Sequence, residues 1–175
     1  QKTRLLSISV WGLVWLVSTD PAVNGFEDLG DQALLSPFQH DLGDVLIDTL
    51  LSAQAKDDAS KVPVRRVRTG QDAIALMLSG KAKHAVLAEP MASMLLWRNQ
   101  QQAAPVSLHR VQSLETAWSQ QFPAQPQLPQ AGLMANATVV ENRALSQAVE
   151  KAYAESAVWC KAQTMQCAQI AHKYL

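Results

Sequence analysis

The stretch HAVLAEPMASMLLWRN, residues 84–99, contains the boundary between a predicted strand and a predicted helix. Residues 84–88 are mainly apolar, branched at their centre and too few for a helix, so they favour a strand. Residues 91–98 carry apolar side chains at helical spacing, behind a proline that suits a first helical turn. Glu89 is therefore predicted at the tip of a strand, immediately before a helix that starts near Pro90.

Units of a strand followed by a helix also precede and follow this stretch. Residues 32–37 and 62–69 are predicted strands, and the helices after them begin at the capping residues Asp41 and Thr69. A fourth strand is predicted over 107–113, ahead of a short helix. This alternation predicts an α/β fold with a mainly parallel sheet flanked by helices.

The segments outside this repeat have other compositions. The first residues favour two strands that pivot at Gly12, although Lys2 and Arg4 ahead of an apolar run also resemble a signal peptide. The strands are preferred because no small-x-small cleavage pattern follows. Three prolines in seven residues, at positions 123, 126 and 129, indicate a linker. The expected organisation is crossing strands or a hinge over 1–18, an α/β lobe over 19–122, a Pro-rich linker over 123–130, and a return strand with carboxyl-terminal helices over 131–175.

The composition is that of a globular chain without a strong overall charge. Acidic and basic residues number fifteen each, and the sequence pI is about 7.1. We therefore expect neither nucleic acid nor a membrane surface as a partner. The basic tract Arg65, Arg66 and Arg68 divides between two faces of a strand, which favours a solvated edge over an anion site. The sequence has no glycine-rich phosphate loop, so no nucleotide or other cofactor is expected.

Residues at the carboxyl ends of the predicted strands are the candidates for binding a ligand. Open α/β sheets hold ligands beyond those ends, where helix starts also offer unpaired N–H groups and a partial positive field. Asp41 and Thr69 have a more ordinary alternative role, because residues of their type at helix starts usually act only as caps. The candidates are Ser36, Phe38, Gln39, His40 and Asp41 after one strand, Thr69 after the next, and Glu89 and Pro90 after the third.

The order of several motifs resembles that of a family of binding proteins. These motifs are WGLVWLVS (11–18), DLG (28–30), LLSP (34–37), RTGQDAIALMLSGKAKHAVLAEPMASMLL (68–96) and LPQAGLMA (128–135). The most specific part, Leu78 to Pro90, combines a helix that ends in glycine, a short strand of small and apolar residues, and Glu-Pro at its tip. On these residues the chain resembles the solute-binding proteins of ABC importers, the family that includes nitrate, sulfonate, bicarbonate and thiamine-precursor binders.

This resemblance implies a type II periplasmic binding fold, in which two α/β lobes close over a solute in the cleft between them. It also implies a protein without enzymatic activity, exported to the periplasm, that delivers a small polar or anionic solute to ABC permease subunits. On this analogy Trp11 and Gly12 lie at a crossing between the lobes, and Trp11 and Phe38 form apolar walls. Glu89 would accept a hydrogen bond from the solute or from the opposite lobe. Its alternative role is to bind nearby backbone N–H groups and brace the turn.

Two departures from the family pattern affect these expectations. The usual lysine-rich turn after Asp-Leu is replaced by Gly30-Asp31-Gln32, which weakens the expectation of an anionic solute. The chain is also far shorter than a two-lobed binder, which suggests a fragment with one lobe and part of a second. Apolar faces that lack their cover, such as that of Leu5 and Ile8, would then promote self-association.

Two other classes of protein resemble the same architecture. The effector domains of LysR-type regulators are cytoplasmic and follow a helix-turn-helix segment, of which nothing is visible in this sequence. Some pyrimidine synthases of thiamine biosynthesis resemble the binding family and use pocket histidines. Only His40 lies at a predicted strand end, and it has no second base, nucleophile or metal set beside it. A binding protein is therefore preferred to a regulator or an enzyme.

The carboxyl-terminal residues are expected to be helical, with Leu145 and Trp159 spaced to face a core. On one unbroken helix the Cα atoms of Cys160 and Cys167 would be about 10.5 Å apart, beyond the ~7 Å that a disulfide permits. Thr164 is a fair helix cap, and the family resemblance also suggests a helix end here, which would let the sulfurs pair. The alternative is two buried thiols. A metal site is not expected, because two cysteines and one distant histidine do not complete a four-ligand shell.

Overall fold

The computed structural model describes residues 3–56 and 61–174, and the chain forms two compact units. One unit is the continuous segment Trp11–Gln130, and the other combines the residues up to Val10 with those from Ala131 onward. The first unit extends beyond residues 18 and 122, where the lobe was expected to begin and end, and the expected division into lobes stays a prediction. All the candidate ligand residues therefore fall within the Trp11–Gln130 unit.

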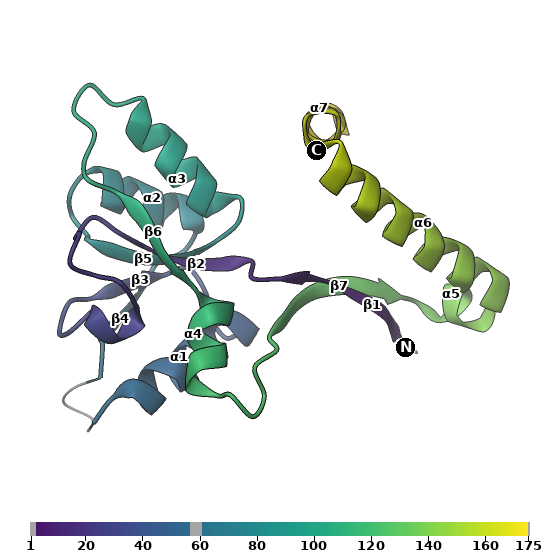
Figure 1. Ribbon diagram of the computed structural model, residues 1–175, viewed down its shortest axis with the longest axis horizontal. Helices are drawn as coiled ribbons and strands as arrows, with labels where there is room; N and C mark the ends of the chain where they lie inside the picture. Colours follow the sequence, from purple (N-terminus) through teal and green to yellow (C-terminus); the bar gives the residue numbers. More distant parts are fainter. Residues whose placement is uncertain (1–2, 57–60, 175) are drawn as a thin grey trace. The chain divides into compact units, whose positions relative to one another are not determined.

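The Trp11–Gln130 unit is built on a five-stranded sheet with the strand order β4-β3-β5-β2-β6 (Figure 1). β3 pairs in parallel with β4 and β5, whereas β2 runs antiparallel to both β5 and β6. Four strands therefore share one direction, which confirms the predicted α/β fold with a mainly parallel sheet. The strands are β2 (Val14–Ser18), β3 (Leu34–Ser36), β4 (Val64–Arg66), β5 (His84–Ala88) and β6 (His109–Ser113).

Helices cover both faces of this sheet. Because successive strand side chains point to opposite faces, Leu16 and Leu34 pack in one apolar cluster, while Val17 and Leu35 pack in another. Burial on both faces is typical of sheets with parallel strands. The first cluster includes residues of α1 (Leu42–Gln54), α4 (Leu114–Gln121) and the 3-10 turn η1 (Phe26–Asp28), and the second includes residues of α2 (Gly70–Leu78) and α3 (Met91–Gln100).

The predicted caps start two of these helices. The side chain of Asp41 accepts a hydrogen bond from the backbone N–H of Asp44 at 2.9 Å, which caps α1. Thr69 and Asp72 form a reciprocal capping box at the start of α2, with the Thr69 hydroxyl accepting at 3.1 Å. Both capping predictions are confirmed, so the loops after β3 and β4 end where the sequence pattern indicated.

The second unit combines a two-stranded sheet with three helices. The hydroxyl groups of Ser9 and Tyr153 are 2.8 Å apart within it. The expectation that Leu145 and Trp159 face a core is wrong, because they are 40% and 41% exposed. Two strands offer too little apolar surface to cover three helices. The elements are β1 (Arg4–Trp11), β7 (Pro129–Ala135), α5 (Ala137–Glu141), α6 (Arg143–Ala162) and α7 (Thr164–Tyr174).

A break between α6 and α7 brings the two cysteines together. α6 ends at Ala162 and α7 begins at Thr164, so the helix end expected near Thr164 is present. The Cα atoms of Cys160 and Cys167 are 5.0 Å apart, and the sulfurs are joined in a disulfide. The break permits this bond, because the same separation along a continuous helix would keep the sulfurs too far apart.

His84, the first residue of β5, is fully buried. Its Nδ1 lies 3.0 Å from Ser18 Oγ, and its Nε2 lies 3.1 Å from the side-chain oxygen of Gln32. A neutral ring that donates from Nε2 and accepts at Nδ1 satisfies both neighbours. Burial lowers the pKa of His84; the Asp20 carboxylate opposes this shift, and Lys83 adds to it. The folded state therefore favours the neutral imidazole.

We expect the folded chain to lose stability as the pH falls below about 6.5, the ordinary pKa of histidine. In that range the unfolded chain binds a proton that folded His84 resists, so the free energy of unfolding declines by at most about 1.4 kcal/mol per pH unit. The free energy of unfolding can be measured with urea at several pH values between about 8 and 5. Its slope against pH should be smaller in His84→Gln than in the wild type. His172→Gln, which alters an exposed histidine of α7, should keep the wild-type slope. Equal slopes in all three proteins would contradict this assignment.

Candidate functional site

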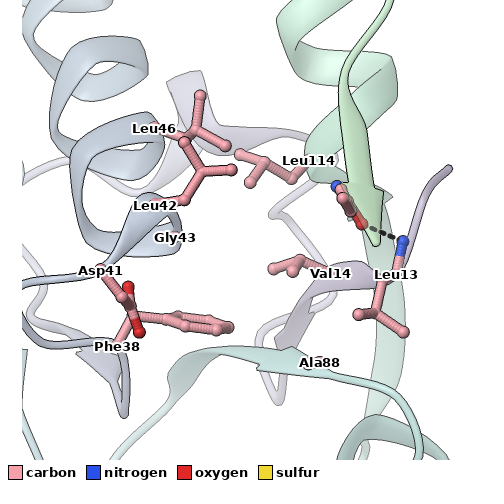
Figure 2. A pocket seen from close by; sticks show the side chains of 10 residues that line it. Leu13, Val14, Phe38, Asp41, Leu42, Gly43, Leu46, Ala88 and Leu114 are labelled. Carbon is pink, nitrogen blue, oxygen red and sulfur yellow. Dashed lines mark hydrogen bonds between the residues drawn. The ribbon is translucent and has the colours of Figure 1, made fainter. Parts of the chain in front are cut away.

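A hollow of about 220 Å³ lies at the edge of the five-stranded sheet where the parallel strands end (Figure 2). Phe38 follows β3, Ala88 ends β5, and Leu114 follows β6, while Val14 starts the antiparallel β2 at the same edge. Ligands of open α/β sheets bind at this edge. The lining residues, all within the Trp11–Gln130 unit, are Leu13, Val14, Phe38, Asp41, Leu42, Gly43, Leu46, Ala88, Leu114 and Gln130.

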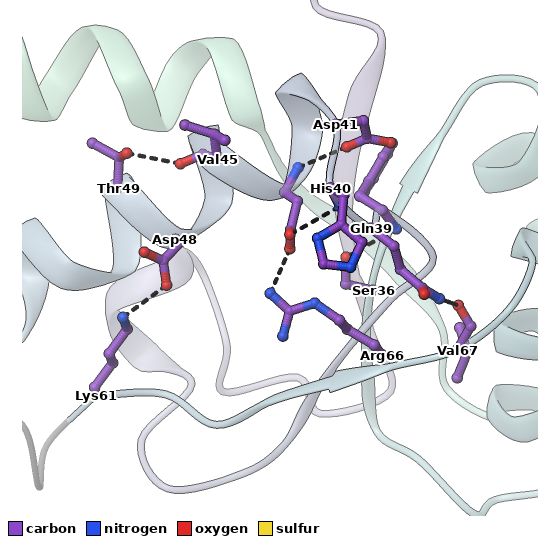
Figure 3. A network of polar contacts seen from close by, with 12 residues as sticks. Ser36, Gln39, His40, Asp41, Val45, Asp48, Thr49, Lys61, Arg66 and Val67 are labelled. Carbon is purple, nitrogen blue, oxygen red and sulfur yellow. Dashed lines mark hydrogen bonds and ion pairs between the residues drawn. The ribbon is translucent and has the colours of Figure 1, made fainter.

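A hydrogen-bonded network holds the start of α1 beside the hollow (Figure 3). Asp44, whose backbone N–H donates to Asp41, accepts from the backbone N–H of His40 at 3.2 Å and from Arg66 at 2.7 Å. Burial raises the pKa of Asp44, but the hydrogen bonds from Arg66 and His40 outweigh burial, so its pKa is lowered overall. Asp44 therefore stays ionised at neutral pH and ties β4 to α1.

Gln130 contributes the second polar side chain of the hollow. Its amide oxygen accepts a hydrogen bond from the backbone N–H of Leu13, which fixes the amide because a backbone N–H can only donate (Figure 2). Its Nε2 is buried and has no hydrogen-bond partner among the described residues. Sequence analysis missed Gln130 because it ends the Pro-rich stretch assigned to a linker. The LPQAGLMA motif that contains it is the signal that points to it.

Of the predicted ligand residues, the structure brings Phe38 and Asp41 together at the hollow. Ser36 is fully buried at the end of β3, where its hydroxyl accepts from the backbone N–H of Phe38 at 3.2 Å. Gln39 donates from Nε2 to a backbone oxygen after β4 at 2.7 Å, and His40 is exposed with a left-handed φ of 56°. These contacts of Ser36, Gln39 and His40 shape the loop between β3 and α1.

Trp11, Gly12 and Thr69 have separate local roles. Trp11 ends β1 and is 43% exposed. Gly12 has a φ of +76°, a conformation that residues with a Cβ rarely adopt, and it turns the chain between β1 and β2. Thr69 caps α2, as Asp41 caps α1. Capping is the ordinary role expected of Thr69, and any contact of Trp11, Gly12 or Thr69 with a solute stays a prediction.

Glu89 follows β5 directly, and both of its carboxylate oxygens have partners. Oε2 accepts from the backbone N–H of Ser93 at 3.1 Å, and Oε1 accepts from Arg110. Arg110 also donates to Ser93 Oγ at 2.6 Å, and its guanidinium lies 5.2 Å from the centre of the Trp15 ring. Pro90 occupies the position before α3, after a cis peptide bond. These hydrogen bonds are those expected if Glu89 braces the turn before α3. A contact of Glu89 with a solute stays a prediction.

Neither a metal-binding cluster nor a membrane-spanning helix is found in the part of the chain that the structure describes. Within residues 3–56 and 61–174, no group of three or more His, Cys, Asp or Glu side chains is placed to hold a metal ion. Over the same ranges, no helix combines the length and the apolar character needed to cross a membrane. The hollow is the candidate site because it lies at the carboxyl edge of the sheet, where open α/β sheets bind ligands.

Solved structures with a similar backbone include proteins named as ABC transporter components and periplasmic binding proteins. An ABC transporter structure from Parabacteroides distasonis matches with a TM-score of 0.67 and 22% identity, over 94% of this chain and 52% of that chain. The periplasmic aliphatic sulphonate binding protein of Escherichia coli matches with a TM-score of 0.65 and 15% identity, over 94% and 51%. The chain has the periplasmic-binding-protein fold. This confirms the resemblance that the sequence motifs predicted, as far as the fold is concerned.

Other comparisons limit what this likeness means. An ancestral arginine-binding protein bound to arginine also matches, with a TM-score of 0.57 and 10% identity, over 89% of this chain and 60% of that chain. No family model and no curated protein matches the sequence. This periplasmic-binding-protein-like chain spans about half the length of the first two structures that it matches. The fold is shared, whereas the named ligands belong to those proteins.

Replacing the cap of α1 should destabilise the chain without changing the fold. Asp41→Ala removes the acceptor for the Asp44 N–H, and we expect the free energy of unfolding to fall by about 1 kcal/mol. Asp41→Asn keeps a capping oxygen, so its stability should stay within a few tenths of a kcal/mol of wild type, as is typical of these two caps. Urea unfolding measures both, with Thr69→Ala as a second cap deletion. Equal stability of Asp41→Ala and Asp41→Asn would show that the cap is not stabilising.

Glu89→Gln separates the two roles considered for this residue. Both oxygens already have protein partners, so we expect a loss of stability below about 1 kcal/mol, as for other partly exposed ion pairs. We expect solute affinity to be unchanged. Calorimetric titration together with urea unfolding makes the comparison. A clear loss of affinity at unchanged stability would instead establish a contact with the solute.

Proposed function

We propose that this chain is part of the solute-binding component of an ABC importer and captures a small polar solute for a membrane permease. The observation that carries the proposal is the hollow at the carboxyl edge of the sheet, in a chain with the periplasmic-binding-protein fold. Names of the matched structures support the same class of function. They favour binding and transport over catalysis or gene regulation.

The lining of the hollow supports the capture of a small molecule. Its side chains are mainly apolar with a few polar groups, which is the usual composition of small-molecule sites. The ring of Phe38 lies against Gly43, where an added Cβ would stand 2.6 Å from its Cδ1. Glycine at this position lets the aromatic ring form a wall of the hollow, the role predicted for Phe38.

The disulfide supports an extracytoplasmic location. Cys160 and Cys167 are joined, and such bonds form and persist in oxidising compartments such as the periplasm. Exposed apolar side chains on α6 and α7 support the expectation of self-association: Val158 is 70% exposed and Met165 is 72% exposed. Export, delivery to a permease and self-association are parts of this proposal.

A thermal-shift panel on the full chain tests the proposal. It contains nitrate, sulfonates, amino acids, thiamine precursors and other small nitrogen compounds, and at least one of them should raise the melting temperature. Phe38→Ala should weaken binding of that compound about tenfold or more, because an apolar contact worth about 1.5 kcal/mol is lost. Trp97→Ala is the control, since Trp97 is 61% exposed on α3. A panel without any stabilising compound would refute capture of these solutes.

A further inference from the structure

The one charged side chain among the lining residues is a carboxylate. Asp41 is charged, Gln130 is polar and neutral, and the other residues that line the hollow are apolar or glycine. The start of α1 adds a partial positive field of about half an elementary charge, which is less than the full negative charge of Asp41. Arg66, on the adjacent β4, is paired with Asp44 at 2.7 Å. The hollow therefore disfavours a bare anion and favours an N–H donor or a cation beside Asp41.

Gln130 has the complementary requirement, because it needs an acceptor. Its oxygen is used by the backbone N–H of Leu13, so the amide cannot turn over without losing that bond. Its Nε2 is buried without a partner among the described residues. A buried donor without a partner is unfavourable, and an acceptor oxygen on a solute would remove that cost.

Apolar surface separates these two polar groups. Figure 2 shows Asp41 and Leu13 on different sides of the hollow, with the side chains of Phe38, Val14 and Leu42 between them. Leu42 is 57% exposed although it lines the hollow. A solute with an apolar body would remove this surface from water, which favours binding.

We propose that the hollow selects a small solute with an apolar body, an N–H donor or cationic nitrogen beside Asp41, and an acceptor oxygen beside Gln130. This inference rests on the proposed function and narrows its solute class. It replaces the expectation of a simple anion, which the turn Gly30-Asp31-Gln32 had already weakened. Nitrate and sulfonates without an amino group are therefore poor solutes for this site.

Three benzene derivatives test the preference by calorimetric titration of the full chain. 4-(Aminomethyl)benzamide offers a cationic nitrogen and an amide oxygen, 4-methylbenzamide lacks the nitrogen that Asp41 would bind, and 4-methylbenzenesulfonate is an anion without an amino group. We expect the first compound to bind about tenfold more tightly than the second, as for a charge-assisted hydrogen bond. The sulfonate should bind least.

Variants assign the preference to the two polar residues. Asp41→Asn keeps a capping side chain but removes the charge, so the tenfold difference between the first two compounds should fall to about twofold. Gln130→Glu keeps an acceptor for the Leu13 N–H but removes the donor, so both amides should bind about tenfold more weakly. Asp72→Asn, which alters a carboxylate in the first turn of α2, should change neither result.

The inference and the proposed function fail in different ways. Equal binding of the sulfonate and 4-(aminomethyl)benzamide, or an undiminished difference in Asp41→Asn, overturns the inference. So does the absence of binding by all three compounds when the thermal-shift panel finds another solute. In each of these cases the proposed function stands as long as the panel contains a solute that binds, whereas a panel without one refutes capture of the panel's solutes and, with it, the proposed function in that form.

Discussion

β2 is hydrogen-bonded between β5 and β6 and runs opposite to both. Because of this direction, the residues that enter β2 stand at the edge of the sheet where β3, β5 and β6 end. Val14 thereby meets the end of β5 at Ala88, and both line the hollow with Leu114. If all five strands ran in one direction, the start of β2 would lie at the opposite edge. The candidate site therefore depends on one reversed strand between β5 and β6.

Leu13 connects this strand to two other parts of the site. Its backbone oxygen accepts from the N–H of Glu89 at 2.9 Å, and its own N–H donates to Gln130. On the other side, Asp41 is held by its bond to the backbone of Asp44. The polar groups of the hollow are thus fixed by hydrogen bonds to the backbone before a ligand arrives. Such preorganisation lowers the entropy that binding must otherwise lose.

Local patterns were sufficient to predict the alternation of strands and helices. Asp41 and Thr69 cap the helices that they were expected to cap, because capping depends on residues within one turn. The place of β2 in the sheet was not predicted, since a five-residue apolar run does not encode its pairing partners. Gln130 was assigned to a linker, and local patterns gave no sign of its partner Leu13, which is 117 residues away in the sequence.

The carboxyl-terminal helices show a second limit of sequence patterns. Helical spacing correctly indicated helices over this region, and Thr164 marked the break between α6 and α7. The same spacing gave no information on whether an apolar face is covered, because burial depends on what else the chain places nearby. Trp159 therefore lies on a helix, as predicted, but is 41% exposed.

The Trp11–Gln130 unit is one uninterrupted piece of chain, whereas the other unit is assembled from residues on both sides of it. The hydrogen bond between Leu13 and Gln130 shows that the entry and exit of this piece are adjacent. Adjacent ends are what allow one domain to be inserted into another without distorting the host. The segment that holds the hollow is therefore suited to replacement as a cassette, in evolution or by engineering. The lining of the hollow can change within it while the residues up to Val10 and from Ala131 onward keep their sequences.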